Sequence, residues 1–149
     1  MGYVLKLRQV TGPRALIVVG AAAVVLQQAR LLLVKRMDNQ LWGLPAGSKE
    51  LNEDLSTTCK RELREETGLV GHEPRLLTVV SGAGMQYTYP NGDQIDSVTT
   101  VYQLTSSGQL QADQHETSDV QFFPLTNLPS ALTPITRQIL SQLQTEQIL

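Results

Sequence analysis

The chain has 149 residues, of which 41% are hydrophobic, and its 12 basic and 14 acidic residues give a net charge of −2. This length suits one domain over 1–149 with its own hydrophobic core, and the small net charge gives no electrostatic reason to expect a nucleic-acid partner. The single cysteine, Cys59, cannot form an internal disulfide, which indicates a reducing compartment and predicts a cytoplasmic protein.

The N-terminal part predicts a helix followed by strands. A short amphipathic helix is expected over 2–10, closed by Gly12-Pro13, and an apolar run follows over 15–26. This run comes after basic residues, as in a secretion signal, but its 12 residues are too few to cross a bilayer as a helix. Its β-branched residues favour a buried strand, and the apolar run over 30–35 is interpreted as its hairpin partner. We therefore expect no membrane segment.

The next stretch predicts a loop and then a helix. Gly, Pro and Asn punctuate residues 37–53, which indicates a loop. Asp54 is predicted to cap a helix over 55–67, and Gly68 to end it. The apolar stripe of this helix, at i, i+4 and i+8, consists of Leu55, Cys59 and Leu63. Cys59 is therefore expected in the core rather than as a nucleophile.

The C-terminal half predicts strands and a final helix. A strand over 75–89, a turn at 90–93 with an Asn-Gly pair, and a strand over 97–105 are expected to form a hairpin. Another strand is expected over 119–125 and an amphipathic helix over 134–148. The order of elements indicates an α+β fold, with helices packed on a mixed sheet.

The helix over 55–67 carries an unusual group of acidic residues. Glu62, Glu65 and Glu66 share one face, with Arg61 beside them and Glu53 just before the helix. Grouped carboxylates repel one another unless they are protonated or bind cations, and oxygen ligands on a rigid helix suit Mg²⁺ or Mn²⁺. The pattern points to hydrolysis of a phosphate linkage. A solvated helix face with surface ion pairs is the alternative interpretation.

The same stretch resembles the signature motif of the Nudix hydrolases, the Nudix box, over residues 47–69. Gly47 is followed after five residues by Glu53, and seven further residues lead to the run RELREETGL. Every fixed position of the box is matched across these 23 residues. The segments "LWGLPAG" and "FFPLTNLP" also resemble family members, so the similarity covers most of the chain, and residues 81–96 are its most individual part.

The resemblance implies a single Nudix hydrolase domain with an α/β/α sandwich fold, in which a mixed β-sheet lies between helices. It implies Mg²⁺- or Mn²⁺-dependent cleavage of a nucleoside diphosphate linked to another group. By position, the implied metal ligands are Glu62, Glu65, Glu66 and the backbone carbonyl of Ala46. Glu62 is also implied as a base, while Glu53 and Arg61 resemble the pair that holds the loop against the helix and orients the site.

Some positions depart from the family pattern without removing a ligand. Ala46 and Asn52 stand where many members have glycine, and Lys49 replaces a commonly aliphatic residue. Asn52 suits a left-handed backbone better than most residues do.

Several residues outside the box are further candidates. Glu116 lies where some members place another acidic ligand or base, although a solvated loop carboxylate is equally consistent. Arg36 could meet substrate phosphate or simply be exposed. Tyr87 and Tyr89 lie on one face of a strand and could stack on a base or cover the sheet edge. His115 is interpreted as a surface residue, and Trp42 as a packing residue.

The expected activity is Mg²⁺-dependent pyrophosphohydrolysis of a small-molecule nucleotide: a nucleotide sugar, a dinucleoside polyphosphate or a nucleoside triphosphate. The alternative is a non-catalytic nucleotide-binding or regulatory Nudix domain. Tyr87, 18 residues after Leu69, resembles a mark of diadenosine polyphosphate hydrolases, while Gly84 stands where ADP-ribose pyrophosphatases tend to have proline. Family members are often dimers, which suggests a homodimer through the segment before Arg14.

Overall fold

The computed structural model describes residues 2–149, and all of the following refers to these residues. The helices are α1 (Tyr3–Thr11), α2 (Leu55–Thr67) and α3 (Pro134–Thr145), with a short 3-10 helix, η1 (Ala83–Met85). The strands are β1 (Leu16–Val24), β2 (Leu26–Gln27), β3 (Arg30–Arg36), β4 (Trp42–Gly43), β5 (Ala46–Ser48), β6 (Val70–Val80), β7 (Gln86–Thr88), β8 (Gln94–Ser107) and β9 (Thr117–Pro124).

The strands form two sheets rather than the single sheet that was expected. The first is mixed, with the order β5-β1-β8-β6 and with β7 also paired to β8; β1 and β8 run parallel and the other pairs antiparallel. The second contains β2, β3, β4 and β9. The two apolar runs at 15–26 and 30–35 therefore do not form one long hairpin. Only β2 pairs with β3 at the turn, because β1 is held between β5 and β8.

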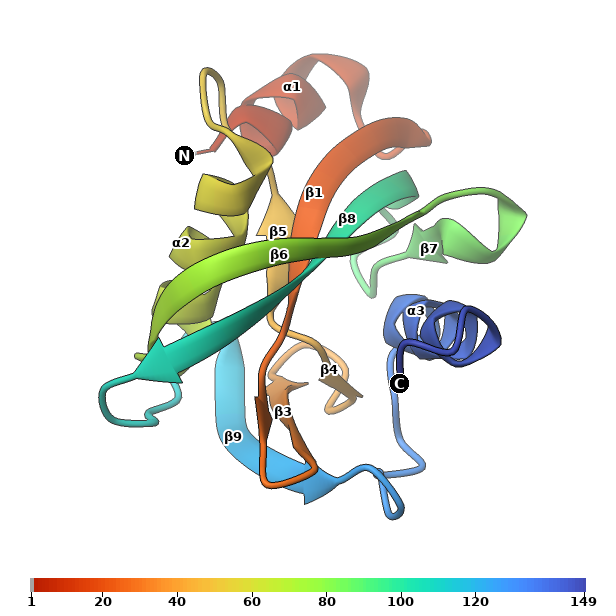
Figure 1. Ribbon diagram of the computed structural model, residues 1–149. Coiled ribbons are helices and arrows are strands. Elements are labelled where there is room, and N and C mark those ends of the chain that lie inside the picture. Colours follow the sequence, from red (N-terminus) through yellow and green to blue (C-terminus); the bar gives the residue numbers. More distant parts are fainter. Residues whose placement is uncertain (1) are drawn as a thin grey trace.

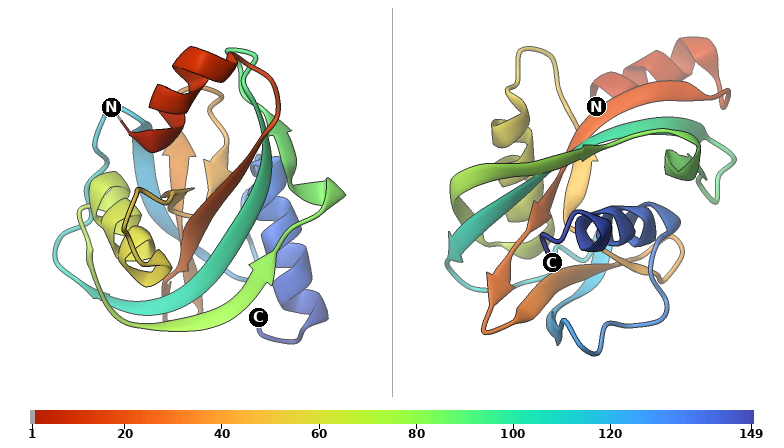
Figure 2. Two further views of the ribbon diagram at one scale, coloured as in Figure 1. Left: turned by 90° about the horizontal axis from the view of Figure 1, so that it is seen from above. Right: turned by 45° about the vertical axis from the view of Figure 1, so that its right-hand side comes forward.

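Helices α2 and α3 cover opposite sides of the strands, and α1 lies at the end of the molecule where the chain begins (Figure 1). The second half of β1 is buried from both sides: Ala21 and Ala23 pack with α2, while Ala22 and Val24 belong to the core on the side of α3. Burial on both faces explains why this half reads as a continuous apolar run, whereas Ile17 in the first half is exposed. The layered arrangement confirms the predicted α+β sandwich (Figure 2).

Two predicted segments are subdivided in the structure. The stretch 37–53 is not loop throughout, because β4 and β5 lie within it and β5 pairs with β1. The strand predicted over 75–89 is broken: β6 ends at Val80, η1 intervenes, and only β7 continues the pairing. Short segments such as these take strand geometry because a neighbouring strand is present, which a local pattern does not reveal.

The helix of the acidic motif has the predicted limits. Gly68 ends α2 in a left-handed conformation with φ 77°, and its N–H bonds to the Arg64 carbonyl, as a C-terminal glycine does. Asp54 occupies the predicted N-cap position, but its side chain makes no capping hydrogen bond. Cys59 and Leu63 are buried in the core as expected. None of the helices within residues 2–149 is long and apolar enough to cross a membrane.

Candidate active site

A pocket of about 530 Å³ opens between α2, the first sheet and the β7–β8 hairpin, and α1 forms part of its wall. This volume is in the range that holds a small-molecule ligand. Seven of the predicted site residues line it: Ala46, Glu62, Glu66, Glu116, Arg36, Tyr87 and Tyr89. The fold thus brings the acidic helix, a distant loop and the hairpin to one cavity.

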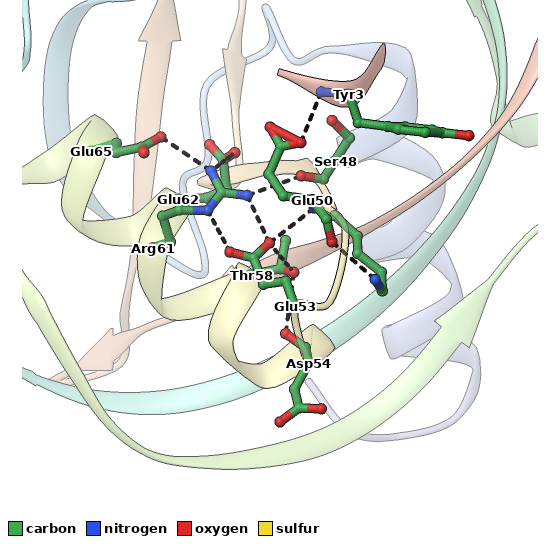
Figure 3. Close-up of polar contacts among 10 residues, drawn as sticks. Tyr3, Ser48, Glu50, Glu53, Asp54, Thr58, Arg61, Glu62 and Glu65 are labelled. Carbon is green, nitrogen blue, oxygen red and sulfur yellow. Dashed lines mark hydrogen bonds and ion pairs between the residues drawn. The ribbon is translucent and has the colours of Figure 1, made fainter. Parts of the chain in front are cut away.

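Arg61 is the centre of an ion-pair network beside this pocket (Figure 3). Its Nε and one terminal nitrogen donate to the two oxygens of Glu53, at 2.7 and 2.9 Å. The same terminal nitrogen donates to the Ser48 carbonyl at 3.0 Å. The other terminal nitrogen donates to Glu62 at 2.9 Å and to Glu65 at 3.4 Å. One guanidinium therefore ties the loop that contains Ser48 and Glu53, the box loop, to helix α2. It also holds two carboxylates of the helix in place.

Glu53 is locked into the loop by several donors. Besides Arg61, the Thr58 hydroxyl donates to it at 2.7 Å and the Glu50 N–H at 3.1 Å. The Arg61 hydrogen bonds are the main reason that the pKa of Glu53 falls to about 2. Glu53 is thus a permanent anion at neutral pH, which agrees with the expected positioning role. Asn52 precedes it with φ 65°, the left-handed geometry foreseen for this position.

Glu62 lies against the backbone of Gly47. A Cβ added to Gly47 would lie 2.2 Å from the Glu62 carboxylate carbon, so any larger residue would displace this carboxylate from its present position. Glu62 is 9% exposed, and burial is the main reason that its pKa rises to about 7; Arg61 opposes the rise. A carboxyl group with this pKa can both hold and release a proton near neutral pH.

Glu66 lies deeper in the pocket and is 5% exposed. Its carboxylate accepts a hydrogen bond from the Ala46 N–H at 3.0 Å. Burial first, and then the nearby charge of Glu62, raise the pKa of Glu66 well above its ordinary value. Two buried carboxyl groups therefore share one region of the pocket, where like charges and desolvation both disfavour the doubly ionised state. Ala46 itself lines the pocket, as expected for a residue next to the site.

The remaining predicted acidic residues lie differently. Glu116 is exposed on a loop and lines the pocket, and its charge contributes to the raised pKa values of Glu62 and Glu66. The Glu65 side chain is 57% exposed, is directed to Arg61 and is not part of the pocket lining. Among residues 2–149, no three acidic, histidine or cysteine side chains are grouped in a way that could hold a metal ion by themselves.

The donor set nevertheless fits a hard cation. Mg²⁺ usually takes one or two protein carboxylates and completes its shell with water and substrate phosphate oxygens. Glu62 and Glu66 supply two buried carboxylates whose ionised forms need a counter-charge, and Glu116 lines the same pocket and adds negative charge to it. A divalent cation is the group that would compensate this buried charge.

The far wall of the pocket is aromatic. The rings of Tyr87 and Tyr89 meet edge to face with centroids 4.9 Å apart. The guanidinium of Arg36 lies 5.6 Å from the centroid of the Tyr89 ring and makes two hydrogen bonds to Asp38, at 2.9 and 2.7 Å. Asn39 donates to the Tyr87 hydroxyl at 2.8 Å, which ties the loop after β3 to the hairpin. These residues form a preorganised wall able to hold a planar group.

Several pocket residues were not foreseen from the sequence. The floor includes Ser97 and Thr99 of β8, and α1 contributes Val4, Leu5 and Arg8 to the wall. An alternating pattern in β8 could have indicated that these two hydroxyls share a face, but not which face lines a cavity. His115, interpreted as a surface residue, is exposed at the pocket edge. Trp42 packs edge to face on Phe123, with centroids 4.8 Å apart, as expected for a packing residue.

Comparison with known proteins shows the family of this chain. The family model described as NUDIX domain matches residues 16–143 of the chain. The ADP-ribose pyrophosphatase of Methanocaldococcus jannaschii is 30% identical over 116 residues, which are 74% of this chain and 64% of the relative. The chain spans about half to two thirds of the length of the first curated relatives that it matches.

Solved structures show the same fold. The MutT NUDIX hydrolase from Burkholderia pseudomallei superposes with a TM-score of 0.72 at 30% identity, covering 85% of this chain and 98% of that one. The NUDIX domain of Shewanella oneidensis NrtR, solved in complex with ADP ribose, superposes with a TM-score of 0.67 at 26% identity and covers 100% of both chains.

Proposed function

This chain belongs to the NUDIX domain family, and we propose that it is a divalent-metal-dependent hydrolase that cleaves the diphosphate linkage of a nucleoside diphosphate joined to another group. The observation that carries the proposal is the pair of buried carboxyl groups, Glu62 and Glu66, with raised pKa values at the end of a nucleotide-sized pocket. Perturbed carboxyl groups in a cavity are characteristic of catalytic sites.

The metal ligands proposed are Glu62 and Glu66, with Glu65, Glu116 and the Ala46 carbonyl as the further positions implied by the family pattern. Mg²⁺ or Mn²⁺ bound there would neutralise phosphate charge and make a bound water more acidic. Glu62 and Glu66 lie in the pocket, whereas the exposed Glu65 would have to turn away from Arg61 to reach it. Glu62 and Glu66 are therefore the stronger candidates.

The other residues of the site are proposed to position it. Arg61 donates to Glu62 while Glu53 compensates the charge of Arg61, so the Glu62 carboxylate is held in one orientation facing the pocket. With its pKa near 7, Glu62 is the candidate to accept a proton from the attacking water. Arg36, Tyr87 and Tyr89 are proposed to bind the nucleotide at the other wall, by charge and by stacking.

A second function has support from one observation. The NUDIX domain of Shewanella oneidensis NrtR, which is similar over the full length of both chains, was solved with ADP ribose bound. A domain that binds a nucleotide without turning it over is therefore the alternative. The buried carboxyl pair favours hydrolysis, because binding alone has no need for carboxyl groups that are costly to ionise.

The test is product analysis after incubation with a nucleotide panel in Mg²⁺, in Mn²⁺ or with a chelator. The panel includes ADP-ribose, diadenosine tetraphosphate, nucleotide sugars, and normal and oxidised deoxynucleoside triphosphates. We expect metal-dependent cleavage within the diphosphate of one class, and no product with the chelator. Tight binding of a nucleotide without any product would favour the binding domain, and cleavage that survives the chelator would contradict the metal assignment.

A further inference from the structure

The floor of the pocket is built from the parallel strands β1 and β8, and the lining residues of β8 include two with hydroxyl groups. In the register of β1 and β8, Val18 lies beside Ser97 and Gly20 beside Thr99, and all four line the pocket. Gly20 is also the neighbour of Ser48 on β5, where a Cβ on Gly20 would lie 2.3 Å from the Gly47 carbonyl oxygen. The floor therefore runs without interruption from the box loop to β8.

Ser97 and Thr99 form a buried hydroxyl pair on this floor. Their oxygens are 2.8 Å apart, and the residues are only 7% and 5% exposed. Within the described chain, residues 2–149, neither hydroxyl makes another hydrogen bond. Two hydroxyls carry two protons, and their mutual bond uses one of them. One donor and several lone pairs thus remain for a molecule in the pocket, and a buried polar group is costly when it stays unpaired.

The position of the pair along the pocket indicates which part of a ligand it meets. Two strand spacings, about 10 Å, separate β5 at the box loop from β8. In the other direction Ile95, two residues before Ser97 on β8, is paired with Tyr87 on β7. The hydroxyl pair therefore lies between the carboxyl groups at one end of the pocket and the aromatic wall at the other.

We propose that the Ser97–Thr99 pair hydrogen-bonds the vicinal hydroxyls of the substrate's ribose, and that the protein therefore selects ribonucleotides over 2′-deoxyribonucleotides. This inference rests on the proposed function. In a nucleotide the pentose lies between the phosphates and the base, and the pair lies between the site suited to phosphates and the wall suited to a base. Two adjacent ribose hydroxyls donate and accept, as the Ser97–Thr99 pair does.

The test compares Ser97→Ala and Thr99→Val with two controls that make the same chemical changes on β8 outside the pocket lining, Ser106→Ala and Thr105→Val. Calorimetry measures the affinities for ADP and 2′-deoxy-ADP in Mg²⁺. We expect the wild type and both controls to favour ADP by about 3- to 10-fold, the range of one or two neutral hydrogen bonds. The variant that removes the hydroxyl bound to the 2′-hydroxyl, either Ser97→Ala or Thr99→Val, should weaken ADP, spare 2′-deoxy-ADP and bring this ratio close to one. The variant that removes the hydroxyl bound to the 3′-hydroxyl should weaken both nucleotides.

A conservative variant separates hydrogen bonding from packing. Thr99→Ser keeps the hydroxyl and should keep the preference for ADP. If Thr99→Val fails to fold, Thr99→Ala removes the hydroxyl in its place. An unchanged ratio in Ser97→Ala and in the folded variant that lacks the Thr99 hydroxyl, or equal affinities in the wild type, would overturn the proposal. Absence of turnover across the nucleotide panel would count against hydrolysis, whereas the binding ratio tests the hydroxyl pair independently.

Discussion

Arg61 and Arg36 lie in two regions around one pocket and are held in opposite ways. Arg61 makes five hydrogen bonds, four of them to carboxylates, and every partner lies between Ser48 and Glu65 in the chain. Arg36 has one carboxylate partner, Asp38, and otherwise lies over the ring of Tyr89, which comes from a distant hairpin. The first region is an ion-pair network. The second is an aromatic wall in which the charge of Arg36 is paired with a single carboxylate, that of Asp38.

The difference suits two tasks. Chemistry on a phosphate needs carboxyl groups kept in one orientation, because small displacements of a reacting group are costly. Binding a nucleotide needs a planar, less charged surface, on which stacking tolerates more variation. The comparison predicts that substitutions near Arg61 affect turnover and stability most, and that those near Arg36 affect binding.

The largest effect is expected for Glu66→Gln. The amide keeps the size of the side chain but cannot supply the charge that holds a cation, so kcat should fall by about 100-fold or more. Circular dichroism should show an intact fold. Glu73→Gln, an exposed and distant carboxylate, is the control and should leave kcat unchanged. Undiminished turnover by Glu66→Gln would remove Glu66 from the metal site.

The next effect concerns the space beside Glu62. In Gly47→Ala the new methyl group would overlap the Glu62 carboxylate, which must move away from its position at Arg61. We expect kcat to fall by about 10- to 100-fold, measured by steady-state kinetics on the best substrate. Gly84→Ala is the control, because its Cβ would meet only the flexible end of Gln138. Equal activities of the two variants would show that Glu62 tolerates displacement.

A matched pair of variants tests the two arginines directly. Arg61→Lys loses the two-pronged contact with Glu53 and should lower the free energy of unfolding by about 1–3 kcal/mol. Arg36→Lys retains a charge beside the exposed Asp38 and should cost less than about 1 kcal/mol, while raising KM. Urea unfolding measures both values. Equal losses of stability would contradict the division of the pocket into a rigid end and a binding end.

The smallest effect is a pH-dependent stabilisation by metal. The folded-state pKa of Glu62, about 7, lies above its ordinary value of 4.5, so its contribution to stability is fully present below about 4.5 and is lost as pH rises through 7. Mg²⁺ should relieve this loss by binding the ionised form. We expect Mg²⁺ to raise Tm by about 2–4 °C at pH 8 and by less at pH 5.

The control for this measurement is Glu66→Gln, in which the shift at pH 8 should shrink. Glu53 acts in the opposite sense and at lower pH. Its pKa is depressed to about 2, so its stabilising contribution is present above 4.5 and is lost as pH falls toward 2. A Tm shift of equal size at pH 5 and pH 8 would argue against metal binding through Glu62.

Much of the first region was predictable from residues close together in the chain. The limits of α2 and its end at Gly68 follow from local signals, and Asn52 suits the left-handed backbone that it adopts. The pairing of Glu53 with Arg61 was expected from the resemblance to the Nudix box. Helical periodicity and backbone preference act over a few residues, so a single sequence carries them in full. The fold class was predictable for the same reason, since the apolar run of β1 indicates a strand, and its second half is buried on both faces.

Only the tertiary structure decided the rest. The parallel pairing of β1 with β8 joins residues about 80 positions apart, and it makes Ser97 and Thr99 the floor of the pocket. The same packing leaves Glu65 exposed and places the Glu62 carboxylate against Gly47. It also places the Arg36 guanidinium over the ring of Tyr89. Such contacts depend on strand register and on the approach of distant segments. Local spacing identifies which residues have the right chemistry, but not which of them meet.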